Sequence, residues 1–158
     1  IATGFPEIQG LVSELVLASG PASDDQAVRS KLADWYAKSA GLKNTGARAI
    51  SALSKGEIPG PENSIGKLVA GGMMQDIAKF AVDLQGLGGL VTDPAIARSQ
   101  AQIQAMLMRS PAVRIEGGTD QILRNIIAER VLGLPEDMRA DKGLAFSQIP
   151  TSQDSGAR

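Results

Sequence analysis

The chain of 158 residues contains no cysteine and no histidine. The lack of cysteine excludes a disulfide framework, a thiolate nucleophile and a cysteine-based metal site. The lack of histidine removes the usual zinc ligand and the side chain that most often exchanges protons near neutral pH. Ser-His-Asp and Cys-His catalysis therefore cannot reside in this chain, and we expect no metal site.

Charge of one sign, aromatic residues and long apolar runs are also scarce. The 16 Lys and Arg residues nearly balance 17 Asp and Glu residues, and aromatic residues make up 3% of the chain. A nucleic-acid surface would need a basic patch or interleaved aromatic side chains, so no nucleic-acid partner is expected. No apolar run reaches the length of a membrane span, and no signal-peptide pattern opens the chain. We therefore expect a cytoplasmic protein without a membrane span.

Helical periodicity is what the sequence does contain. Apolar residues recur at intervals of three and four over 1–18, 23–55 and 62–84, and Gly and Pro residues separate these stretches. Two shorter helices are expected over 95–108 and 119–132. No segment shows the alternation of a half-buried strand. The sequence therefore predicts an all-α fold, an antiparallel helix bundle with a flexible C-terminal tail.

The domain boundaries follow from the same pattern. Residues 1–135 form the predicted bundle, and the polar residues 136–158 form a tail that is either flexible or packed on a partner subunit. No capping residue precedes the first apolar pattern, so we expect that helix to be already running at Ile1 and to end near Ala18. Pro111 is expected to end the helix that begins near residue 95. The inward positions expected are the stripe from Val28 to Leu53, and Ile96, Ile103, Leu107, Ile122, Leu123, Ile126, Ile127 and Val131.

A Gly-Gly-Thr turn opens the last predicted helix, within the stretch RIEGGTDQILRNIIAERVLGLP at 114–135. Thr119 is a candidate N-cap, and Gly133 with Pro135 ends the apolar run. Free backbone N–H groups and the helix dipole make such a helix start attractive to phosphate or carboxylate. Physically this is a weak indication of function, because most such turns are plain loop-to-helix junctions.

This stretch resembles the signature near the C-terminus of flavin-dependent acyl-CoA dehydrogenases. The long amphipathic helix from Asp24, the SIGKL at 64–68 and the DLQGLGG at 83–89 occur in the order expected of that family. The resemblance covers most of the predicted bundle and implies the C-terminal all-helical domain of the family. In a complete enzyme this domain follows an N-terminal helical domain and a middle β-domain.

The resemblance also implies a cofactor, a substrate and partners. The cofactor would be FAD, and the complete enzyme would act on an acyl-CoA. The partner would be either a second copy, in a dimer or tetramer, or a related acyl-CoA dehydrogenase subunit. Many relatives carry an Arg and a Phe-Gly that reach a partner's FAD, and nothing similar occurs over 19–25. This departure implies altered or partial cofactor binding across the interface, as in relatives that assemble as unlike subunit pairs.

The FAD contacts implied by the resemblance lie in two places. In the turn they are Gly117, Gly118, Thr119 and Gln121, with the two glycines allowing the backbone to approach the cofactor closely. In the loop that ends the third long stretch, Gly86 resembles a residue that contacts the FAD of a neighbouring subunit. Asp83 precedes it and stands where many relatives have Gln.

The catalytic base has two candidate positions. Many family members place a Glu directly before Gly-Thr, but Gly117 occupies that position here and Glu116 lies one residue earlier. Other members place the base on the preceding long helix, which would put it upstream of Ile1. We prefer the second interpretation, which predicts that the 158 residues alone are inactive. The alternative function is a non-catalytic helical assembly module that has lost cofactor binding.

Overall fold

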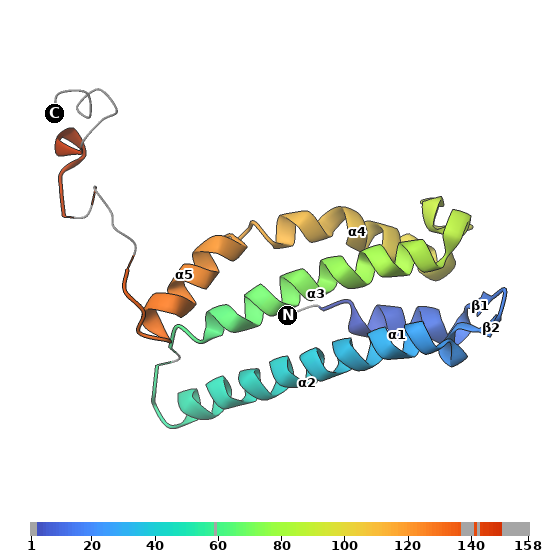
Figure 1. The fold of residues 1–158 in the computed structure, drawn as a ribbon, viewed down its shortest axis with the longest axis horizontal. Helices are drawn as coiled ribbons and strands as arrows, with labels where there is room; N and C mark the ends of the chain where they lie inside the picture. The colour runs from blue at the N-terminus through green and yellow to red at the C-terminus, as the bar shows by residue number, and fades with distance from the viewer. Residues whose placement is uncertain (1–2, 59, 137–140, 142, 150–158) are drawn as a thin grey trace.

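The computed structural model describes residues 3–58, 60–136, 141 and 143–149, and Figure 1 shows its arrangement. The α-helices in these parts of the chain are α1 (Phe5–Glu14), α2 (Gln26–Ser54), α3 (Asn63–Leu84), α4 (Gln102–Val113) and α5 (Asp120–Arg130). The predicted all-α fold is confirmed. α3 is the central helix, because it contacts α1, α2, α4 and α5, and it runs antiparallel to α2 (Figure 1).

Short elements join the helices. The 3-10 turns are η1 (Ala22–Asp24), η2 (Gly86–Leu90), η3 (Arg98–Ala101) and η4 (Phe146–Gln148). Two strands of two residues each, β1 (Val16–Leu17) and β2 (Gly20–Pro21), form an antiparallel pair in which Val16 lies opposite Pro21. No helix in the described parts of the chain is long and apolar enough to cross a membrane.

The core lies where α1, the first half of α2 and the second half of α3 meet. Its buried residues include Ile8, Leu11, Val28, Trp35, Ile77 and Ile103. The Trp35 ring packs edge-on against Phe80, with ring centroids 5.3 Å apart and planes at 69°. Asp25 starts α2 by accepting hydrogen bonds from the N–H groups of Ala27 and Val28, which satisfies two donors that the helix cannot.

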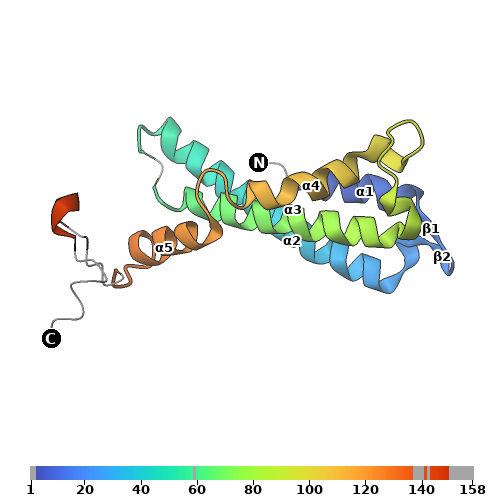
Figure 2. The same cartoon turned by 90° about the horizontal axis from the view of Figure 1, so that it is seen from above.

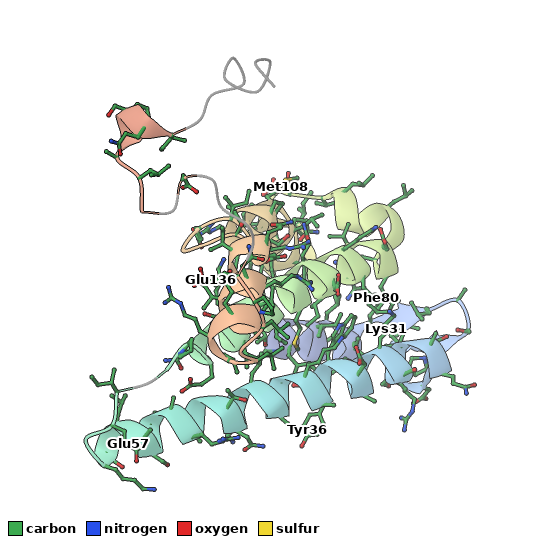
Figure 3. All side chains as sticks on the ribbon, turned by 60° about the vertical axis from the view of Figure 1, so that its left-hand side comes forward. Lys31, Tyr36, Glu57, Phe80, Met108 and Glu136 are labelled. Carbon is green, nitrogen blue, oxygen red and sulfur yellow. The ribbon has the colours of Figure 1, made fainter. Side chains whose placement is uncertain are left out.

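The second half of α2 is less covered than its apolar stripe predicts. Val28 and Trp35 are the buried residues of this helix, whereas Ile50 is 69% exposed and Leu53 is 55% exposed. A groove of about 590 Å³ runs beside it, lined by Leu42, Gly46, Ile50 and Gly66 among others. Glu57, in the turn after α2, marks this far end of the helix (Figure 3). The stripe is therefore helical throughout but buried only near the core.

Helix α1 begins and ends differently from the prediction. It starts at Phe5, after Gly4 with φ of 79°, and the Phe5 N–H points to the Thr3 hydroxyl at 3.4 Å. The backbone therefore leaves the helix at Gly4, and Ile1 lies outside the described residues. The helix ends at Glu14 instead of near Ala18, because the β1–β2 pair takes over the residues that follow.

Helix α4 differs in two respects from what the sequence predicts. A left-handed turn at Ser99, Gln100 and Ala101 precedes it, so the helix begins at Gln102 and Ile96 stays 76% exposed. Pro111 lies inside the helix instead of ending it. The ring removes one backbone donor, and the Ser110 hydroxyl donates instead to the Leu107 carbonyl at 2.9 Å. This side-chain bond satisfies the acceptor that a proline would otherwise leave free.

Helix α5 packs against α3 with one narrow face. Leu123 is buried, but Ile122 is 52% exposed and Val131 is 41% exposed, in contrast to the predicted inward face. Figures 1 and 2 show α5 extending beyond the end of the bundle at which α3 begins, where few other elements can cover it. Most of the predicted tail lies outside the described residues, which include only Glu136, Asp141 and 143–149 of it.

Candidate functional site

The Gly-Gly-Thr turn rests on one stripe of α3. Lys67, Gly71 and Gln75 are spaced by four residues and therefore share a face of that helix. The Lys67 ammonium donates to the Gly118 carbonyl, and Gln75 accepts from the Arg114 guanidinium at 2.6 Å. Between them Gly71 faces residue 114, and a Cβ there would meet the Arg114 Cγ at an ordinary contact distance of 3.5 Å. The stripe thus holds the turn at both ends.

The predicted cap of α5 is present. The Thr119 hydroxyl accepts from the Ile122 N–H at 3.3 Å, as an N-cap does. Gly117 and Gly118 have φ of 62° and 104°, a conformation that side chains other than glycine rarely adopt. The N–H groups of Thr119, Asp120 and Gln121 have no acceptor within the described parts of the chain. The structure therefore brings the predicted residues of this turn together around free backbone donors.

A hollow lies against the turn, and we call it the Thr119 hollow. Its volume is about 240 Å³, and it is lined by Gln75, Pro111, Arg114, Ile115, Thr119, Asp120 and Gln121. The Asp120 carboxylate accepts from the Arg114 Nε at 2.7 Å, and the Asp120 side chain is only 9% exposed. Its other oxygen, Oδ1, is buried without a hydrogen-bond donor among the described residues. The hollow thus combines free N–H donors, one cation and one unsatisfied acceptor.

The second predicted contact, at Asp83 and Gly86, lies at the C-terminal end of α3. Gln75, which lines the Thr119 hollow, and Leu84 are separated by nine helical residues, or on the order of 14 Å along the axis. Asp83 is exposed, and Gly86 has φ of 54° with open space around its Cα. The structure therefore does not bring the two predicted contact regions together within one chain.

Two glutamines beside Gly86 were missed by the sequence analysis. Gln85 and Gln104 each have a buried side-chain oxygen without a donor among the described residues, and Gln104 is only 4% exposed. Gln104 donates weakly to the Gly88 carbonyl at 3.5 Å, so it supports the loop from α4. Its burial depends on the approach of α4, which no local pattern indicates. Gln85 lies within the DLQGLGG motif and could have been singled out there.

Gly89 makes the closest backbone approach in this loop, and we expect Gly89→Ala to destabilise the protein by about 1–2 kcal/mol. A Cβ at this position would lie 2.3 Å from the Val82 carbonyl oxygen, which belongs to the backbone of α3. Gly88→Ala is the matched control, because its Cβ would meet only the Gln85 Cβ at 4.0 Å. Urea unfolding of both variants measures the difference. Equal stability of the two variants would contradict the close approach.

Glu116, the candidate base, is held by an ion pair. Both of its carboxylate oxygens lie 2.6 Å from the Arg109 Nη2, and the two side chains are about half exposed. It lies outside the residues that line the Thr119 hollow. A different carboxylate, Glu7 on α1, lines a separate hollow of about 430 Å³ with Met106, and its Oε2 is buried without a donor among the residues described. Glu116 is therefore paired with Arg109 and is not among the residues that line the Thr119 hollow.

The partners of the turn were also missed by the sequence analysis. Lys67 belongs to SIGKL, but its bond to Gly118 joins residues that are 51 positions apart. Arg114 and Asp120 lie within the signature, and their opposite charges at a spacing of six gave a local indication of pairing. Within the described residues, no group of three His, Cys, Asp or Glu side chains is arranged to hold a metal ion.

Comparisons with known proteins bear directly on this arrangement. The family model of the acyl-CoA dehydrogenase C-terminal domain matches residues 3–132. Acyl-CoA dehydrogenase IpdE1 of Mycolicibacterium smegmatis is 33% identical over 126 residues, which cover 80% of this chain and 30% of the relative. Acyl-CoA dehydrogenase FadE34 of Mycobacterium tuberculosis is 34% identical over 89 residues, which cover 56% of this chain and 11% of the relative.

Solved structures show the same fold. The ChsE4-ChsE5 complex from Mycobacterium tuberculosis has a TM-score of 0.70 at 22% identity, covering 84% of this chain and 35% of that one. Butyryl-CoA dehydrogenase from Megasphaera elsdenii has a TM-score of 0.64 at 18% identity, covering 82% and 32%. The chain spans about a third or less of the length of these relatives. The match over residues 3–132 shows that the chain belongs to the acyl-CoA dehydrogenase family and contains its C-terminal, all-helical domain.

Proposed function

We propose that this chain is the FAD-contacting and oligomerising domain of a flavin-dependent acyl-CoA dehydrogenase, which oxidises an acyl-CoA thioester to its 2,3-enoyl form. The observation that carries the proposal is the family match over 3–132 together with the turn that it contains. That turn presents three free N–H donors at the start of α5, and the helix dipole adds to their attraction for a phosphate-bearing ligand. We place this protein in the cytoplasm.

The residues of the turn fit the dinucleotide part of FAD. Gly117 has open space where a Cβ would stand, so the backbone there is accessible to a ligand. Thr119 and Gln121 line the Thr119 hollow, and the exposed Gln121 amide can donate and accept. When bound in the complete enzyme, the flavin of FAD serves as the hydride acceptor in acyl-CoA oxidation. Thr119 and Gln121 would bind and orient the far end of the cofactor.

The base is proposed to come from upstream of Ile1. Removal of a proton beside the thioester needs a carboxylate that is free to accept it. Glu116 is held by Arg109 and lies outside the Thr119 hollow, which supports the upstream position. The 158 residues are therefore inactive by themselves in this proposal.

The separation of the two contact regions supports assembly of subunits. The turn lies against Lys67, Gly71 and Gln75 of α3, and the Gly86 loop follows the last residue of that helix, so each would serve a different FAD in this proposal. One FAD would then be contacted by the turn of its own subunit and the loop of a neighbour. Two of the structural neighbours are named as pairs of chains, ChsE4-ChsE5 and the Tcur3481-Tcur3483 steroid acyl-CoA dehydrogenase. The partner here is proposed to be either a second copy or a related dehydrogenase subunit.

The proposal is tested by FAD binding to the protein as its natural source makes it. We expect a subunit mass well above 16.4 kDa, bound FAD, and bleaching of the flavin absorbance by an acyl-CoA. Gln121→Ala should weaken FAD binding about tenfold through a lost hydrogen bond, without lowering the melting temperature. Gln9→Ala, an exposed glutamine on α1, is the matched control and should bind FAD normally. Absence of flavin and of bleaching would refute the proposed activity.

The second candidate function is a non-catalytic helical assembly module. The ion pair that occupies Glu116 favours it, because the described residues then contain no evident base at the turn. FAD stabilises only a state that binds it, so an increase in melting temperature on adding FAD supports the first function. A natural subunit of 16.4 kDa with no such increase would support the assembly module instead.

A further inference from the structure

The charged Lys67 side chain forms its hydrogen bond with a neutral acceptor. Its ammonium donates to the Gly118 carbonyl, and among the described residues it forms no ion pair with a carboxylate. The side chain is half-buried between α3 and the turn. A surface lysine on a helix usually extends into water, so this inward bond needs an explanation beyond solubility.

The bond determines which way one peptide group faces. In a trans peptide the C=O and the following N–H point in opposite directions, and the described residues contain no cis peptide bond. Since the Gly118 carbonyl points toward Lys67 on α3, the Thr119 N–H points away from α3. That N–H has no acceptor among the described residues.

Two glycines precede Thr119, with φ of 62° and 104°, and glycine can adopt many other backbone conformations at little cost. Contacts outside the turn are therefore needed to fix where the Gly118 carbonyl lies. The other end of the turn is held independently, by Arg114 on Gln75 at 2.6 Å and on Asp120 at 2.7 Å. Lys67 is therefore the contact that holds the Gly118 carbonyl against α3.

The same face of the turn carries a second indication of a ligand. Asp120 lines the Thr119 hollow, its side chain is 9% exposed, and its Oδ1 is buried with no donor in the part of the chain that the structure describes. A buried carboxylate oxygen without a donor is costly unless something supplies one. Hydroxyl groups of a nucleotide ribose could do so, and its phosphates could accept from the N–H groups nearby.

We propose that Lys67 is a positioning residue for the cofactor, which holds the Gly118–Thr119 peptide so that the Thr119 N–H faces the dinucleotide part of FAD. This inference rests on the proposed function. Lys67 itself contacts the protein backbone and need not touch the cofactor. It affects FAD binding by keeping the Gly118 carbonyl directed toward α3 and the Thr119 N–H directed away from α3.

The experiment compares Lys67→Met with Lys79→Met in the full-length flavoprotein. Lys79 is an exposed lysine on the same helix, and it forms no ion pair with any residue that the structure describes. We expect Lys67→Met to raise the FAD dissociation constant about tenfold, and Lys79→Met to leave it unchanged. In the FAD-free protein with labelled threonine, the Thr119 amide resonance should shift in Lys67→Met alone. Lys67→Arg, which keeps a donor, should restore most of the affinity.

Each result decides a separate part of the inference. An unchanged FAD dissociation constant in Lys67→Met, with normal binding by the unaltered protein, overturns the positioning role. An unchanged Thr119 amide resonance overturns it as well, whatever the affinity. If the unaltered protein binds no FAD, the proposed function fails, and the Thr119 resonance still tests whether Lys67 orients the peptide. If Lys67→Met does not fold, Lys67→Gln is measured in its place against the same expectations.

Discussion

We expect Trp35→Ala to lower the free energy of unfolding by about 3–5 kcal/mol, the range for removing a buried aromatic side chain. Trp35 is 2% exposed and packs edge-on against Phe80 of α3. Only one other residue of α2, Val28, is buried. The substitution therefore removes one of the two buried side chains of the longest helix, which is otherwise attached to the core by Val28 and the half-buried Leu32. Whole domains are stabilised by about 5–15 kcal/mol, so the expected loss is a large fraction of the total stability.

Urea unfolding followed by far-UV circular dichroism measures this effect, since Trp35 is the single tryptophan and fluorescence would be lost with it. Tyr36→Ala is the control, because Tyr36 is the next residue along α2 and is 64% exposed. Its ring is 6.1 Å from that of Phe5, so a loss of up to about 1 kcal/mol is expected. A Trp35→Ala variant no less stable than Tyr36→Ala would show that α2 is attached in another way.

The second large effect is expected for Arg114→Leu, which should cost about 2–3 kcal/mol of stability. Removing one partner of a fully buried ion pair costs about 3–5 kcal/mol, because the other charge stays buried without compensation. Asp120 is 9% exposed and would be that charge, whereas Arg114 is 43% exposed, which reduces the expected loss. The Arg114→Leu variant also loses the bond to Gln75 and with it one anchor of the turn.

Two further variants separate charge from packing in this case. Adding Asp120→Asn to Arg114→Leu should recover part of the loss, because a neutral amide is less costly to bury than a carboxylate. Arg109→Leu removes an ion pair whose two side chains are 54% and 53% exposed, and exposed pairs contribute about 0–1 kcal/mol. Chemical unfolding of all three variants provides the comparison. Equal losses for Arg114→Leu and Arg109→Leu would mean that the burial of Asp120 has no energetic consequence.

Local features of the helices were predictable from the sequence. The cap at Thr119 was predicted at the right residue, because its hydroxyl bonds to a backbone donor only three positions away. The start of α3 was predicted within one residue, since the turn before it is rich in Pro and Gly. Pro111 was predicted wrongly, because the rule that proline ends a helix neglects the Ser110 hydroxyl that satisfies the free carbonyl.

Burial was harder to predict than helicity. Ile122 and Val131 belong to an apolar pattern that the sequence assigns to the inside, yet both are exposed, because α5 extends past the end of the bundle. Ile96 was predicted to face inward, but the left-handed turn at Ser99, Gln100 and Ala101 separates it from α4. A periodic pattern indicates which side of a helix is apolar, but whether another element covers that side depends on packing.

The candidate site depends partly on local sequence features and partly on how the helices pack. The sequence by itself determined the helical bundle, the family resemblance and the position of the Gly-Gly-Thr turn, because capping, glycine conformation and apolar spacing act over a few neighbouring residues. Only the tertiary structure decided that Glu116 is paired with Arg109, that Asp120 is buried and that Lys67 reaches Gly118. Lys67 and Gly118 are 51 positions apart, and they meet only because α3 and the start of α5 pack together. Contacts of that kind depend on how helices are placed in space, which a local pattern does not specify.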